Sequence, residues 1–229
     1  MARPGEGLRV CARPPTVARM GLAITVGMLA SVAGDDEGVA YYRRQFTALA
    51  GALEAAGVVG YDEPERVARG LQRPHVSSFP YSFLHYLRRA YARVKAGMEV
   101  TPVDAAGLAA DDGLVEDEAM MFSSHLLCHS DAEGYYVPVD FSEPLFLEDP
   151  AVSGGGMIGS SQRLLGELRE IAPALGIALA ADGSLADDEA ARLAEVDDGA
   201  PLFREHIVWL TLHEACRASV ASGAAIVFN

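Results

Sequence analysis

The densest run of groups that could do acid–base or metal chemistry lies at residues 123–134, SSHLLCHSDAEG. Here His125, His129, Asp131 and Glu133 place two imidazoles and two carboxylates close together in the sequence. Imidazole can act as a general acid or base near neutral pH, and imidazole with carboxylate is a common ligand set for zinc or non-haem iron. These four residues are the candidate catalytic residues.

The alternation of residue types over 124–130 predicts a strand, in which His125 and His129 share one face. Four residues at the rise of a strand separate them by about 13 Å, which one ion cannot bridge. A helix would bring the two imidazoles together, but the pattern favours a strand. The sequence therefore leaves it unknown whether a metal or a cofactor binds.

A glycine-rich segment, GGGMIGSS at 154–161, precedes a predicted helix. Free backbone N–H groups and the helix dipole favour phosphate or carboxylate at such a place, so Gly156, Ser160, Ser161 and Arg163 are candidate ligand-binding residues. The segment lacks the lysine of a P-loop, and a glycine turn with a serine cap is the simpler interpretation.

A second candidate binding region is the aromatic stretch SSFPYSFLHY at 77–86, which leads into a basic helix. His85 and Arg88 are the candidate ligand-binding residues here, with Arg88 as an anion holder. Core packing at a helix entry is the simpler explanation of the aromatic residues.

Apolar periodicity predicts the helices that would position these groups. Residues 124–130 and 135–141 predict two strands of a hairpin around a turn at 131–134, and residues 98–118, rich in Ala, Asp, Gly and Pro, predict a solvated loop. The sequence thus predicts an α+β fold in which several amphipathic helices pack on a small, mainly antiparallel sheet with a central hairpin near 124–141. The predicted helices are 37–56, 80–96, 160–175, 186–195 and 201–219, with a strand or short helix at 21–33 and a last strand at 224–228.

The charge of the chain is strongly negative, with 32 acidic and 18 basic residues and a formal net charge of -14. Such a field repels phosphate backbones and anionic lipid, so we expect neither nucleic acid nor a membrane as partner. An acidic surface could mimic nucleic acid or dock on a basic protein, although solubility alone is the simpler explanation.

The N-terminal residues 1–19 are rich in Pro and Arg and have no core-forming pattern, so we expect an extension there and a single α+β domain over 20–229. Arginines before the apolar run at 21–29 are similar to a signal peptide, and secretion is the alternative. The short, interrupted run and three widely spaced cysteines favour a reducing, cytoplasmic location.

Three stretches together resemble a group of uncharacterised bacterial proteins. They are PYSFLHYLRRAYARV from Pro80, SHLLCHSDAEGYYVPVDF from Ser124 and GGMIGSSQRLLGEL from Gly155. The resemblance spans roughly residues 20–180 and implies a cytosolic domain; it carries no activity, cofactor or catalytic residue.

The leading functional hypothesis is an acidic cytosolic binding protein, immunity-like or regulatory, with a basic protein as partner, because the chain is acidic and no catalytic motif is complete. The alternative is a small-molecule or metal-dependent enzyme that uses the His125/His129/Asp131/Glu133 region. Convergence of these groups on one pocket would favour the enzyme.

Overall fold

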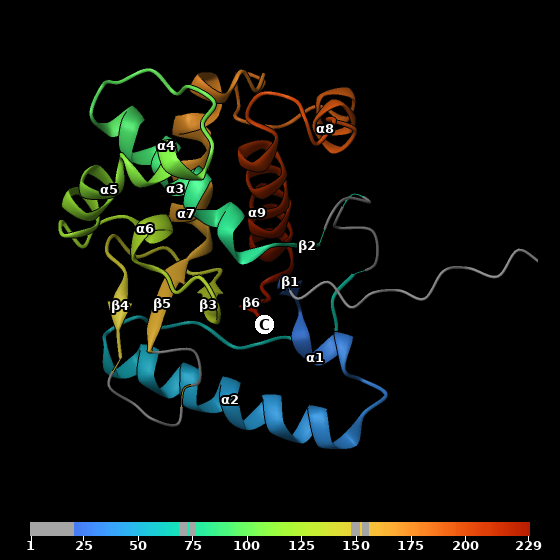
Figure 1. Cartoon of the computed structure of the whole chain (residues 1–229). Coiled ribbons are helices and arrows are strands. Elements are labelled where there is room, and N and C mark those ends of the chain that lie inside the picture. Colours follow the sequence, from blue (N-terminus) through green and yellow to red (C-terminus); the bar gives the residue numbers. More distant parts are fainter. Residues whose placement is uncertain (1–20, 69–72, 74–76, 148–151, 153–155) are drawn as a thin grey trace, which may run out of the picture.

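The computed structural model describes residues 21–68, 73, 77–147, 152 and 156–229 (Figure 1). The predicted extension at 1–19 lies outside these residues, and a single domain over 20–229 stays a prediction. Within the described part of the chain, no helix is both long enough and apolar enough to cross a membrane.

One six-stranded mixed sheet organises the molecule, in the order β2-β1-β6-β3-β5-β4. The last strand, β6, pairs antiparallel with both β1 and β3, so the end of the chain lies in the middle of the sheet. β3 and β5 pair in parallel, and the remaining pairs are antiparallel. The strands are β1 Leu22–Val26, β2 Ser78–Phe79, β3 Gly134–Val137, β4 Leu145–Phe146, β5 Met157–Ser160 and β6 Ile226–Phe228.

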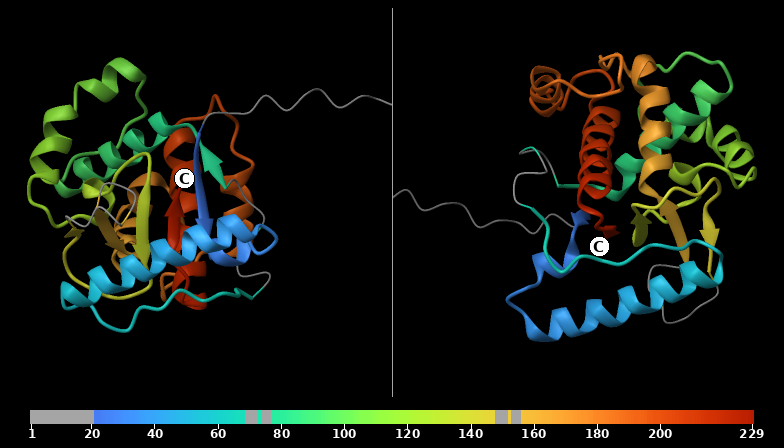
Figure 2. Two further views of the ribbon diagram at one scale, coloured as in Figure 1. Left: turned by 90° about the horizontal axis from the view of Figure 1, so that it is seen from below. Right: turned by 180° about the vertical axis from the view of Figure 1, so that it is seen from behind.

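Helices cover both faces of this sheet (Figures 1 and 2). Successive strand residues point to opposite faces, so Tyr135 and Val137 join the core beneath α1 and α2, while Tyr136 joins the core beneath α3, α7 and α9. The long helix α2 runs across the first face. The bounds are α1 Met28–Ser31, α2 Asp36–Ala55, α3 Tyr81–Lys95, α7 Ser161–Ile171 and α9 Phe203–Ser222.

Apolar periodicity located α2, α3, α7 and α9, together with α8 (Asp187–Ala194) and the 3-10 turn η1 (Ala172–Leu175) that continues α7, whereas the segment 21–33, left open as a strand or short helix, contains both β1 and α1. The helix α9 is buried almost all round, as its even spread of apolar residues predicts. Trp209 is fully buried there, and its indole Nε1–H donates to the carbonyl oxygen of Leu168 at 2.7 Å. α9 is therefore the central helix of the larger core.

The predicted α+β class and the mainly antiparallel sheet are confirmed. The predicted hairpin near 124–141 is wrong, because its first half is the short helix α6 (His125–Cys128) and β3 pairs with β5 and β6. Ser124 caps α6 by accepting from the N–H of Leu127 at 3.1 Å. The two strands that flank β3 come from distant parts of the chain, which local alternation cannot reveal.

The predicted loop at 98–118 is also wrong, because it contains α4 (Ala105–Ala109) and α5 (Asp112–Ala119). The side chain of Asp104 caps α4 by accepting from the N–H of Gly107 at 2.9 Å. Alanine and leucine have high helix propensity, and short polar residues at caps favour helix starts. Four acidic residues of this segment, Asp112, Glu116, Asp117 and Glu118, are consequently held on α5.

Candidate functional site

The predicted catalytic residue His125 is a buried structural residue at the start of α6. Its Nδ1 accepts a hydrogen bond from the N–H of Ser160 at 2.9 Å, which joins α6 to the end of β5. Burial lowers the pKa of His125 to about 4. The imidazole is therefore neutral near pH 7 and holds two elements together.

Sequence reasoning missed Glu167, which lies on α7 and caps α6 from outside. Its carboxylate accepts from the N–H groups of His125 and Leu126, at 2.7 and 2.8 Å. Burial raises the pKa of Glu167 to about 7. The first N–H groups of a helix lack partners within it, so this contact stabilises the helical form of 125–128.

The second predicted histidine, His129, stacks on Tyr136 with ring centroids 4.1 Å apart. It is buried, and burial lowers its pKa to about 4. Arg88 donates to the carbonyl oxygens of Leu126, at 3.0 Å, and of His129. This predicted anion holder is buried and occupied by backbone oxygens, so it binds the end of α6.

The remaining residues of the predicted catalytic group lie apart from these contacts. The Nε2 atom of His85 is 3.4 Å from Oδ2 of Asp131, at the surface, and Glu133 is exposed. Each candidate thus has its own set of contacts. Across the described ranges, no group of three or more His, Cys, Asp or Glu side chains could hold a metal ion.

The glycine–serine segment has local structural partners. Ser160 caps α7 by accepting from the N–H of Arg163, and the hydroxyl groups of Ser161 and Ser219 are 2.8 Å apart. Gly156 has φ +75° and lies against the backbone of Leu147. Its role in ligand binding, like that of Ser160 and Ser161, stays a prediction.

Arg163 faces a cleft next to α6 and α7. Its Nε lies 2.6 Å from Oδ1 of Asp140, which lines the same cleft. The cation is thus paired with a carboxylate of this chain. The cleft is lined by Ser123, His125, Asp140, Ser142, Gln162, Arg163, Gly166 and Glu167.

A second feature is the distribution of charge along the chain. The chain has no lysine or arginine between Lys95 and Arg163, and this stretch holds thirteen acidic residues. This stretch of acidic residues without lysine or arginine can be read from the sequence, but the arrangement of its side chains in space cannot. The thirteen are Glu99, Asp104, Asp111, Asp112, Glu116, Asp117, Glu118, Asp131, Glu133, Asp140, Glu143, Glu148 and Asp149.

Six of these side chains form what we call the acidic ridge, on and beside α4 and α5, at the end of the molecule opposite α2 (Figure 1). Five are exposed and one, Glu118, is half-buried. Among the described residues, none of the six is in an ion pair with a cation. The ridge consists of Glu99, Asp104, Asp112, Glu116, Asp117 and Glu118.

Averaged along the helix axis, the charge of α5 is close to that of one DNA strand. Eight residues of helix measure about 12 Å, so four carboxylates give one per roughly 3 Å. A single strand of B-DNA carries one phosphate per about 3.4 Å of axis. The four carboxylates are those of Asp112, Glu116, Asp117 and Glu118.

Further acidic residues lie at a second cleft, which Arg204 also lines. Val103, next to Asp104, lines this cleft together with Asp198. Asp197 and Glu195 precede Asp198 and are exposed as well. Negative charge therefore extends from α5 toward the loop after α8.

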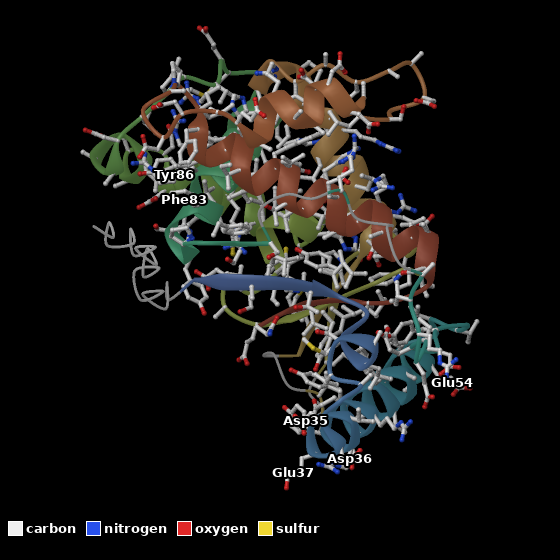
Figure 3. The ribbon with its side chains drawn as sticks, turned by 90° about the vertical axis from the view of Figure 1, so that its right-hand side faces the viewer. Asp35, Asp36, Glu37, Glu54, Phe83 and Tyr86 are labelled. Atoms are coloured by element: carbon white, nitrogen blue, oxygen red, sulfur yellow. The ribbon has the colours of Figure 1, made fainter. Side chains whose placement is uncertain are left out.

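The described cations mostly have partners, so they do little to neutralise the ridge. Arg204 lies over the rings of Phe83 and Tyr86, with its guanidinium carbon 5.7 and 4.5 Å from their centroids; Figure 3 shows both rings on α3. Others are in ion pairs with carboxylates: Arg43, Arg73, Arg89, Arg93, Lys95, Arg163, Arg192 and Arg217.

The acidic residues of α2 are arranged differently. Asp35, Asp36 and Glu37 gather at its first turn and Glu54 lies near its other end (Figure 3). Asp35 is the N-cap and accepts from the N–H of Glu37 at 3.1 Å. Carboxylates at a helix N-terminus compensate the helix dipole. This accounts for the acidic residues at the first turn of α2 and for Asp112 at the first turn of α5, whereas Glu116, Asp117 and Glu118 lie farther along α5.

A family model matches residues 20–228, which is nearly the whole chain, and its description is "Putative DNA-mimic protein". Within the matched residues, 31 are acidic and 14 are basic. Searches of the curated proteins and of the solved structures gave no match. The protein belongs to the family described as DNA-mimic proteins.

Proposed function

We propose that this protein is a DNA mimic, and that its acidic ridge occupies the DNA-contacting surface of a DNA-binding protein. The observation that carries the proposal is α5, whose four carboxylates, three of them exposed, give an average charge per unit of helix length close to that of a DNA strand and have no cation partner among the described residues. The family to which the chain belongs supports it.

The physical basis is the same electrostatic term that dominates DNA binding. Lysine and arginine on a DNA-binding protein neutralise phosphates and release condensed counterions, which makes binding weaken steeply with salt. Carboxylates on a fixed scaffold attract the same cations at short range. Since α5 is helical, its carboxylates are held at fixed spacing, so less conformational freedom is lost on binding than for a flexible acidic loop.

Family membership corrects the functional hypotheses drawn from the sequence. The enzyme that uses His125 and His129 is wrong, because the family description refers to mimicry of DNA and no catalytic chemistry. The hypothesis of an acidic binding protein fits the family in part; mimicry of nucleic acid was one use considered for the acidic surface, and solubility was taken as the simpler explanation. The partner prediction is wrong in leaving nucleic acid out, since the partner of a DNA mimic is defined by its DNA-binding surface.

Three further expectations from the sequence are part of this proposal. They are a bacterial origin, a cytoplasmic location and one domain over residues 20–229. A target that binds DNA in a cell without a nucleus would be met in the cytoplasm, which supports the location proposed.

The experiment is displacement of DNA-binding proteins from DNA. Proteins of a cell extract from the source organism are bound to DNA-cellulose, and the purified chain is added at increasing concentration. We expect release of a specific DNA-binding protein, identified by mass spectrometry, at about micromolar concentration or below. No release at any concentration would contradict the proposal.

Two triple variants make the test specific to the ridge. Asp112→Asn, Glu116→Gln and Asp117→Asn neutralise α5, and we expect this variant to need at least about 10-fold more protein for half-release. The control is neutralised on α2 by Asp36→Asn, Glu37→Gln and Glu54→Gln, with the same change in net charge (Figure 3). Equal loss in both variants would show that net charge, and not the ridge, is responsible.

A further inference from the structure

An exposed apolar patch directly follows the acidic ridge. Met120, Met121 and Phe122 come just after α5, with 68%, 70% and 54% of their surface exposed. Phe146 on the edge strand β4 is 55% exposed, and its ring centroid lies 5.7 Å from that of Phe122 in an edge-to-face contact. Figures 1 and 2 show α5 and β4 on the same side of the molecule. These four side chains form the apolar patch.

The backbone at Phe122 is strained. Its φ is +52°, in the left-handed region that favours glycine and disfavours a bulky side chain. The residue is exposed, so core packing does not account for phenylalanine at this position. A strained, exposed aromatic residue is the kind of feature that clusters at functional sites.

Acidic residues flank the residues of the apolar patch in the sequence. Asp117 and Glu118 precede Met120, and Glu143, which is exposed, precedes Phe146 by three residues. A second copy of this chain would bring two such sets of like charges together, in a protein whose net charge is -14. A partner with basic residues around an apolar side chain fits this surface, because its charges are complementary where those of a second copy repel.

We infer that the apolar patch is the anchor of the partner interface: it receives an apolar side chain of the DNA-binding protein while the neighbouring ridge binds that protein's basic residues. The inference rests on the proposed function and deepens it. DNA presents phosphates but no exposed aromatic side chain beside them, so the patch would give the chain affinity that DNA itself lacks. Binding energy at interfaces is concentrated in such aromatic anchors.

The test uses the same DNA-cellulose displacement with a double variant, Met121→Ser and Phe122→Gly. Glycine relieves the positive φ while the ring contact with Phe146 is lost, so we expect the two effects to offset each other and the unfolding temperature to change little. We expect half-release to need roughly 10- to 30-fold more of the variant, because an anchor is removed. We expect an unchanged dependence of release on salt, since no charge is altered.

Matched variants separate the possible outcomes. Val59→Ser removes an equally exposed apolar side chain, 69% exposed, after α2, and should leave release unchanged. Full release by the patch variant together with loss in the α5 triple variant would overturn the inference and leave the proposed function intact. If the wild-type protein releases no DNA-binding protein, both the inference and the proposed function are contradicted. A wild-type dimer in sedimentation that the patch variant abolishes would assign the patch to self-association and overturn the inference.

Discussion

The Nε atom of Arg89 lies 2.6 Å from Oδ2 of Asp111, and this ion pair fastens the start of the acidic ridge to the core helix α3. Arg89 is 2% exposed, and its Nη1 also donates to the carbonyl oxygen of Thr101 at 3.0 Å. Arg93 adds a second contact to the same carboxylate at 2.9 Å. The carboxylate of Asp111 thus holds α5 in place, whereas the ridge carboxylates beyond it are available to a partner.

The first prediction concerns this attachment. Asp111→Asn leaves the buried Arg89 without a charged partner, so we expect a loss of about 2–3 kcal/mol in the free energy of unfolding. Urea unfolding at pH 7 measures it. The exposed neighbour variant Asp112→Asn should change stability by less than about 0.5 kcal/mol.

The Asp111 contact also predicts a pH dependence. Burial acts to raise the pKa of Asp111, but hydrogen bonds from Arg89 and Arg93 outweigh it, and the pKa lies below its ordinary value. Stability from this group is therefore present above about pH 4 and lost as the pH falls through the folded-state pKa. The difference between wild type and Asp111→Asn should shrink below about pH 4; a constant difference would contradict the ion pair.

The second prediction is that the ridge reduces the stability of the fold. Asp112 and Glu116 are four residues apart on α5, and such like-charge pairs cost about 0.2–0.5 kcal/mol. Glu116→Gln removes this pair and leaves Asp112 at the first turn of α5, so the variant should be more stable than wild type by about 0.2–0.5 kcal/mol at low salt. Added NaCl should reduce the difference in stability between variant and wild type, because it screens exposed charges. Thermal unfolding in a salt series measures both effects, and Glu54→Gln on α2 is the control.

The third prediction concerns Glu63, which is buried between α2 and the last strand. Its Oε2 accepts from the Tyr61 hydroxyl at 2.8 Å and from the N–H of Ala225 at 2.7 Å. Burial raises the pKa of Glu63 to about 7. The folded state therefore holds a proton that the unfolded state releases above about pH 4.3, so stability falls as the pH rises from there to about 7.

Glu63→Gln should remove that fall. We expect the variant to gain about 3 kcal/mol relative to wild type between pH 5 and pH 8. The comparison isolates Glu63, because Glu167, His125 and His129 titrate in both proteins. Parallel pH profiles of the two proteins would show that Glu63 ionises freely in the fold.

The fourth prediction tests the packing of β5 on β3. A Cβ built at Gly159 overlaps the ring of Tyr136, so Gly159→Ala should destabilise the fold by about 2 kcal/mol or more. Gly166 on α7 has open space around its Cβ position, and Gly166→Ala should stabilise by about 0.5–1 kcal/mol. Urea unfolding of the two variants separates the cost of steric overlap at residue 159 from the effect of replacing a helical glycine at residue 166. Equal changes in the free energy of unfolding would contradict the predicted overlap with Tyr136.

Much of the fold could be predicted because helix periodicity is local. The stripe on α2 and the apolar α9 needed only the neighbours of each residue, and both were located within a few residues of their true ends. The α6 segment failed for the opposite reason: Glu167, 42 residues beyond His125, supplies the acceptor that completes the helix start. No local pattern contains that contact.

For the candidate site too, some features could be read from the sequence and others depend on tertiary packing. The sequence by itself determined the composition of the surface: the net charge, the cation-free stretch after Lys95 and the apolar run at 120–122. Only the tertiary structure decided that Arg89 and Arg93 hold Asp111, that α5 displays its carboxylates outward, and that Phe146 joins Phe122. Charge is a sum over residues and can be read from their identities, whereas a surface depends on which distant segments pack together.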